Sequence, residues 1–288
     1  MRRIISYFLT LVSTLTFISC ERDANVKLPD TAPKPVLVCF ISPQDSIIKV
    51  MLTNSRQIYT TQKGNYPYII KNADVKISIN GTSATIPFIN DSLGYQLSTK
   101  FFSIKEGEKY FLEVNIPDGR KLSSNTQVPA KKPSEIKYKS IRTLYDSSEF
   151  FIDLSYDKEI SWNDIPGEKN TYRALVYILR ITKNSNDTTA LQYAEFYKTD
   201  EIGDGSILTI SSQIYAGYST DTLSGDFPTF VGTIAFLIVG NDDYIKYHKD
   251  LTRNVVESNP FSEPTINFSN IKGGIGCFGA YLMDRKRL

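Results

Sequence analysis

The stretch ADVKISINGTSATIPFIN, residues 73–90, indicates what kind of fold this chain adopts. Its first part alternates apolar and polar side chains with a period of two, which is typical of a β-strand with one buried face. Asn80-Gly81 follows, and this pair favours a type I′ turn because both central positions of that turn need positive φ. We therefore predict a β-hairpin here, with TSATIPFIN as its second strand.

Short runs of the same kind recur on both sides of this hairpin. PVLVCFIS and SIIKVMLTN precede it and are joined by Pro43-Gln44-Asp45; GYQLSTKF, EKYFLEVNI and RKLSSNTQV follow it, with Pro117-Asp118-Gly119 between the last two. Short strands at this spacing, separated by turn residues, are typical of a β-sandwich. We expect an immunoglobulin-like sandwich over residues 35–129, followed by a linker at VPAKKPSE.

The second half of the chain carries a second set of strand-like runs, which we assign to a fibronectin-like β domain over residues 134–288. Trp162, a Pro-Gly turn and then Tyr172 resemble the B–C region of fibronectin type III domains, where the indole packs between two sheets. A sugar-stacking platform is the other interpretation of Trp162, but Ile160 shares its strand face and favours the core. FVGTIAFLIVG is apolar on both faces and is expected at the centre of a sheet.

One helix is expected near the C-terminus, so the predicted fold class is mainly β with two sandwiches and one short helix. Asn241 or Asp242 can cap the helix. Four positions then fall at helical spacing for one apolar face: Tyr244, Tyr247 or His248, Leu251 and Val255.

The N-terminus resembles a bacterial lipoprotein signal peptide, residues 1–19. Arg2 and Arg3 supply a positive start, and an apolar run of about fifteen residues follows, which is short for a membrane-spanning helix. Ser19 is a small residue directly before Cys20, whose sulfur would carry the lipid. The polar, proline-containing residues 20–34 cannot bury much apolar area, and we expect them to form a tether. An ordinary secretory signal with an incidental cysteine is the alternative.

The charge of the mature chain excludes a strongly basic nucleic-acid-binding surface. The sequence has 33 Lys and Arg against 31 Asp and Glu, and removal of Arg2 and Arg3 leaves 31 of each. We therefore expect no nucleic-acid partner. Cys39 and Cys277 remain after Cys20; export would permit a disulfide, but both lie in apolar strand-like segments and are expected to be buried free thiols.

The glycine-rich stretch KGGIGCFGAY, residues 272–281, contains the spacing GxGxxG, but its context is that of a strand. A dinucleotide-binding loop opens a helix and needs an acidic residue about twenty positions further on. Only nine residues follow Gly279. We predict a strand with close backbone approach, no cofactor, and no role for Cys277 as a nucleophile.

The remaining candidate sites are few. His248 is the single histidine, so neither a histidine-based triad nor a multi-histidine metal site can be built. Asp200, Glu201 and Asp204 could hold calcium through carboxylate oxygens, although Asp204-Gly205 is also a good turn. Tyr66 and Tyr68 could form a recognition loop, or that loop could fold onto its own sandwich. No catalytic residues are predicted, because no pair of carboxylates is indicated for one cleft.

Several stretches, taken in order, resemble a family of Bacteroidetes lipoproteins called domain of unknown function 4249. They are SCERDANVKLPDTAPKPVLVCFISPQDSIIKVMLTNSR, YPYIIKNADVKISING, EGEKYFLEVNIPDGRKLSSNTQVPA and SEPTINFSNIKGGIGCFGAY. The resemblance implies an outer-membrane-attached protein that is often associated with TonB-dependent transporters, and it implies no established activity.

The sequence and this resemblance lead to a ranked set of functional hypotheses. The first is a lipid-anchored, noncatalytic lipoprotein that binds a ligand or acts as an accessory component beside a TonB-dependent outer-membrane transporter. The second is a surface adhesin or structural envelope protein. The third is an enzyme acting on envelope polysaccharide.

Overall fold

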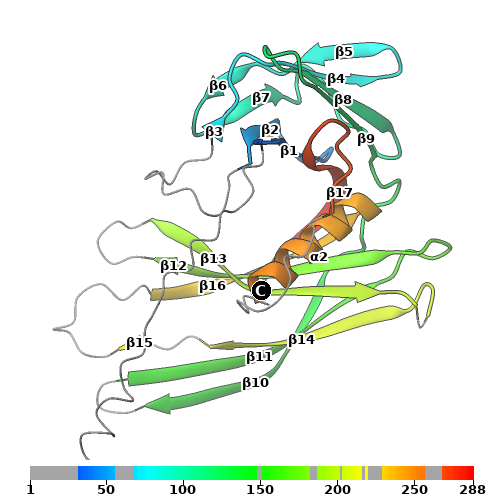
Figure 1. Ribbon diagram of the computed structural model, residues 1–288. Coiled ribbons are helices and arrows are strands. Elements are labelled where there is room, and N and C mark those ends of the chain that lie inside the picture. Colours follow the sequence, from blue (N-terminus) through cyan, green and yellow to red (C-terminus); the bar gives the residue numbers. More distant parts are fainter. Residues whose placement is uncertain are drawn as a thin grey trace, which may run out of the picture. The chain divides into compact units, whose positions relative to one another are not determined.

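The central feature of the fold is a long sheet in which the first and last strands lie side by side (Figure 1). The computed structural model describes residues 32–55, 68–147, 151–181, 187–201, 203–215, 218–219, 229–256 and 268–288. Within these residues, nine strands form this sheet. Their order is β13 (Thr188–Thr199), β12 (Thr171–Ile181), β16 (Thr229–Gly240), β17 (Ile275–Arg287), β1 (Pro35–Ile41), β2 (Ile47–Asn54), β7 (Gly94–Ser98) and β6 (Phe88–Asn90), with β3 (Tyr68–Ile69) paired to β2.

Two smaller sheets pack against one face of the long sheet. The first contains β5 (Thr82–Thr85), β4 (Asp74–Ile79), β8 (Lys109–Asn115) and β9 (Lys121–Gln127). The second contains β10 (Lys137–Ser147), β11 (Phe151–Asn163) and β14 (Ile207–Tyr215), with β15 (Tyr218–Ser219) paired to β11. The fold is therefore mainly β and of the sandwich type, as predicted.

Each sandwich has its own hydrophobic core. The first core joins β4 and β8 to β1, β2 and β17, through side chains such as Leu37, Ile77 and Phe278. The second joins β11 and β14 to β12 and β16. Trp162 is fully buried there, with its ring centroid 5.5 Å from that of Tyr172. The prediction that Trp162 belongs to the core is confirmed.

The predicted hairpin at Asn80-Gly81 is confirmed, but its second strand is shorter than expected. Asn80 has φ 47° and Gly81 has φ 79°, and β4 pairs with β5 across this turn. The run TSATIPFIN divides at Pro87, because proline has no N–H to donate to a strand ladder. Its second part becomes β6, which pairs with β7 in the long sheet.

The helix α2 (Asp242–Val256) packs on the face of the long sheet that carries Leu175 and Ile238, which is opposite to the face that forms both sandwich cores. Asn241 caps it, because its Oδ1 accepts a hydrogen bond of 3.1 Å from the backbone N–H of Tyr244. Gly279 allows the close approach: a Cβ there would lie 3.1 Å from the Cα of Tyr244. The expected apolar face is only partly correct, since Leu251 is 38% exposed, whereas Ile245 is buried.

The strand β17 connects the regions that the sequence assigned to separate domains. It is hydrogen-bonded to β16 on one side and, in parallel, to β1 on the other. The division into domains at residues 35–129 and 134–288 stays a prediction. The signal peptide of residues 1–19 and the first part of the tether, to residue 31, lie outside the described residues.

Candidate functional site

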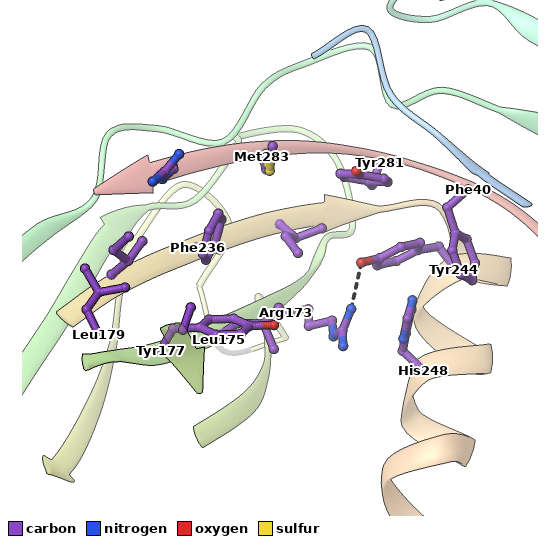
Figure 2. Close-up of a pocket in the computed structure, with 14 residues that line it drawn as sticks. Phe40, Arg173, Leu175, Tyr177, Leu179, Phe236, Tyr244, His248, Tyr281 and Met283 are labelled. Atoms are coloured by element: carbon purple, nitrogen blue, oxygen red, sulfur yellow. Dashed lines mark hydrogen bonds between the residues drawn. The ribbon is translucent and has the colours of Figure 1, made fainter. Parts of the chain in front are cut away.

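A groove with a volume of about 500 Å³ lies on the α2 side of the long sheet (Figure 2). Its floor comes from β12, β16 and β17, one end is closed by α2 and β1, and β13 contributes to one edge. Most of the side chains that line it are apolar or aromatic. They are Phe40, Arg173, Leu175, Tyr177, Leu179, Ala190, Ile234, Phe236, Ile238, Tyr244, His248, Tyr281, Met283 and Arg285.

Strand register explains why these side chains meet on one face. Successive side chains of a strand point to opposite faces, so paired positions on neighbouring strands share a face. Phe236 of β16 is paired with Leu175 on one side and with Arg285 on the other. The alternate residues of β12 and β16 enter the second sandwich core. These strands are thus apolar on both faces because one face forms the core and the other forms the groove.

A buried ion pair fixes the wall of the groove beside α2. The Nε of Arg173 donates a 2.7 Å hydrogen bond to Oε1 of Glu195, and Nη1 donates one of 2.7 Å to the hydroxyl of Tyr244 (Figure 2). Both charged side chains are only 11% exposed. Burial raises the pKa of Glu195, but hydrogen bonds from Tyr197 and Arg173 outweigh it and the net shift is downward. The charge of Arg173 is therefore neutralised within the protein.

The second arginine of the groove, Arg285, is not neutralised by a carboxylate among the described residues. Arg285 is exposed, and its guanidinium lies 5.7 Å from the centroid of the Phe236 ring. It forms no salt bridge with any residue in the described part of the chain. Its positive charge is thus available at the rim of an apolar surface.

The end of the groove at α2 is aromatic and neutral. The ring of His248 lies 4.4 Å from that of Tyr244 and 4.9 Å from that of Phe40. Burial, helped by the charge of Arg173, lowers the pKa of His248 to about 3, so the imidazole is uncharged near neutral pH. Its Nε2 is buried and has no hydrogen-bond partner among the described residues. The hydroxyl of Tyr281 donates to Asp45, at 2.9 Å from Oδ2.

Only two of the three acidic residues that were considered for calcium, Asp200 and Asp204, lie close together in the structure. Asp200 and Asp204 have carboxylate oxygens within 4.8 Å of each other and of Asp164, which the sequence analysis did not include; Glu201 is not in this group. Backbone N–H groups donate to all three carboxylates at 2.8 Å: Gly205 to Asp164, Asn170 to Asp200 and Gly167 to Asp204. These hydrogen bonds tie the β11–β12 loop to the β13–β14 loop.

Residues 275–281 of the glycine-rich stretch lie in strand β17, as predicted, whereas residues 272–274 precede the strand. Both remaining cysteines are buried free thiols, as predicted. Burial, together with the charge of Asp243, raises the pKa of Cys277 to about 12. Burial also raises the pKa of Cys39. A thiol with such a pKa is protonated at neutral pH and is a weak nucleophile.

Three other predicted site residues lie at or beyond the limits of the described residues. Cys20 and Tyr66 are outside them. Tyr68 begins β3, where its backbone pairs with Asn54, and its side chain is not among those described. The lipidation site and the tyrosine recognition loop therefore stay predictions.

The groove was not predicted from the sequence, although the sequence carries one signal for it. FVGTIAFLIVG is apolar on both faces, so each face must pack against another element or a ligand to be removed from water. The sequence does not show that α2 covers only part of the second face. Arg173 and Glu195 were also missed, because their pairing across β12 and β13 depends on strand register.

Comparisons with known proteins give the following findings. A protein-family model described as "Domain of unknown function (DUF4249)" matches residues 21–287. No match was found among curated proteins.

Proposed function

We propose, from the premise that this chain belongs to the DUF4249 family, that it is a lipid-anchored, noncatalytic protein that binds a ligand in the groove beside α2. The single observation that carries the proposal is the groove itself. Apolar side chains of three adjacent strands line a groove of about 500 Å³, a volume within the range of small-molecule sites.

The titratable groups around the groove support binding over chemistry. Arg173 and Glu195 neutralise each other, and His248 is uncharged near neutral pH. An acid–base catalyst works best with a pKa near the working pH. With a pKa of about 3, His248 would be a poor proton donor or acceptor there. The groove instead offers apolar contact area, which is what retains a ligand without changing it.

The sequence before the described residues supports attachment to a membrane. A lipoprotein signal ending at Ser19 would place a lipid on Cys20, and two or more acyl chains give stable anchoring. Among the described residues, the structure contains no helix that is both long and apolar enough to cross a bilayer. We place the protein at the outer membrane, beside a TonB-dependent transporter, on the basis of the family resemblance.

Two variants of β13 test whether the groove binds a ligand. Ala190 is exposed and lines the groove, so Ala190→Trp should fill part of it with little effect on stability. Leu191 is 52% exposed and points to the other face, so Leu191→Trp is the matched control.

The experiment extracts bound small molecules from full-length chain purified out of native membranes and identifies them by mass spectrometry. The proposal expects a molecule that accompanies the wild type and Leu191→Trp but is depleted at least tenfold from Ala190→Trp. If extracts of all three proteins are the same, the groove is not a binding site.

A further inference from the structure

We propose that the groove binds a linear aliphatic carboxylate, with the carboxylate on Arg285 and the hydrocarbon chain extended along β16 and β17 toward α2. This inference rests on the proposed function, because it names the chemical class of the ligand for the same groove. It is drawn from the charges and the apolar path of the site.

The position of Arg285 supports an anionic group at one end of the ligand. Arg285 is exposed, its guanidinium lies over the ring of Phe236, and it has no carboxylate partner in the described residues. The neighbouring cation Lys286 differs, because it points to the other face and its Nζ lies 2.6 Å from Oε1 of Glu135. An arginine fork matches a carboxylate with two parallel hydrogen bonds. Arg285 is therefore the cation in the groove that a ligand anion can reach.

The rest of the groove suits a hydrocarbon chain. Tyr281 and Arg285 are four residues apart on β17, so the path between them is about 13 Å along the strand. Met283 lies between them, and Phe236 and Ile238 line the neighbouring strand. Each methylene that leaves water for such a surface contributes about 0.8 kcal/mol. An extended aliphatic chain follows this path with continuous apolar contact.

The far end of the groove favours a ligand with a single charged group. Arg173 is already paired with Glu195, and burial keeps His248 neutral. A second anion at this end would have to leave water without a free cation to meet it, which is costly. The aromatic rings of Phe40 and Tyr244 instead form an apolar end wall. A monocarboxylate therefore fits better than a dicarboxylate or a phosphorylated sugar.

The test compares two probes with the same hydrocarbon chain by isothermal titration calorimetry: dodecanoate, whose head group is an anion, and dodecanamide, whose head group is neutral. The protein is the full-length chain in lipid nanodiscs, and titrations into empty nanodiscs give the background from partitioning. We expect saturable binding of dodecanoate, at least tenfold weaker binding of dodecanamide, and loss of both with Ala190→Trp. Arg285→Gln should weaken dodecanoate about tenfold and leave dodecanamide unchanged, whereas the control Lys286→Gln should change neither.

Two other results would overturn the inference, and they differ in what they say about the proposed function. If both probes bind equally and Arg285→Gln has no effect, the groove takes apolar ligands but not through a carboxylate, and the proposed function stands. If neither probe binds, the aliphatic carboxylate is wrong. The extraction experiment then decides about the proposed function: a molecule depleted by Ala190→Trp retains it, and unchanged extracts reject it as well.

Discussion

Replacement of His248 by glutamine should reduce the loss of stability between pH 8 and pH 5 by about 2 kcal/mol. His248 lies between Phe40, Tyr244 and Tyr247. Burial and the charge of Arg173 lower its folded-state pKa from 6.5 to about 3, and the charge of Glu195 opposes them. Below pH 6.5 the unfolded chain binds a proton at this residue, and the folded chain does not until about pH 3. Stability therefore falls as the pH drops through this range.

The magnitude follows from the linkage between protonation and folding. At pH 5, a shift from 6.5 to about 3 corresponds to a loss of about 2 kcal/mol relative to pH 8. His248 is the single histidine, so no other imidazole titrates in this range. Burial raises the pKa of Asp45, so this group makes the protein more stable as the pH falls. Its contribution is the same in both proteins and cancels when their stabilities are compared. Carboxylates with lowered pKa, such as Glu195, titrate below this range.

The assay is urea unfolding of the wild type and His248→Gln at pH 8 and pH 5. The fluorescence of Trp162, the single tryptophan, reports the loss of the buried core. We expect the wild type to lose about 2 kcal/mol more than the variant over this interval. Equal losses in the two proteins would show that His248 is not held neutral by burial, and the reasoning would be refuted.

Three further predictions test the anchor, the strand contact and the core. Cys20→Ala should move the protein from the membrane fraction to the soluble fraction in a fractionation blot, and full retention would contradict lipidation. Gly276→Ala should lower the free energy of unfolding by about 3 kcal/mol or more in urea, because φ is 121° and a Cβ would lie 2.0 Å from the carbonyl oxygen of Leu37. Gly119→Ala is the matched control, because φ there is 93° but no atom lies within 4 Å of the added Cβ. The control should lower the free energy of unfolding by less. Trp162→Ala should cost about 3–5 kcal/mol by thermal unfolding, and a cost below about 1 kcal/mol would argue against its role in the core.

Local sequence patterns predicted most of the fold. Alternation and turn residues located the hairpins at Asn80-Gly81 and Asp118-Gly119, and the cap at Asn241 marked the start of α2. These features depend on residues close together in the chain, so the sequence carries them directly. The split of TSATIPFIN at Pro87 was missed, although proline gives a local reason for it.

The site could not be predicted in the same way, because it depends on contacts between distant residues. The parallel pairing of β1 with β17 joins residues more than two hundred positions apart and brings Phe40 to the end of the groove. The pairing of Arg173 with Glu195 depends on the register of β12 and β13, and this register shifts between Val176 and Tyr177. Alternation cannot give such a register. Arg285 belongs to the charged stretch DRKRL at residues 284–288, and only the pairing of β17 shows that it lies on the groove.

Hydrogen exchange with and without dodecanoate, on the full-length chain in nanodiscs, tests most directly whether the ligand lies in the groove. Ligand binding should slow the exchange of backbone amides in β12, β16, β17 and α2, which surround the groove. It should leave β4, β5 and β8 of the first sandwich unchanged. Slowing confined to β4, β5 and β8, or no slowing at a saturating concentration, would contradict the account.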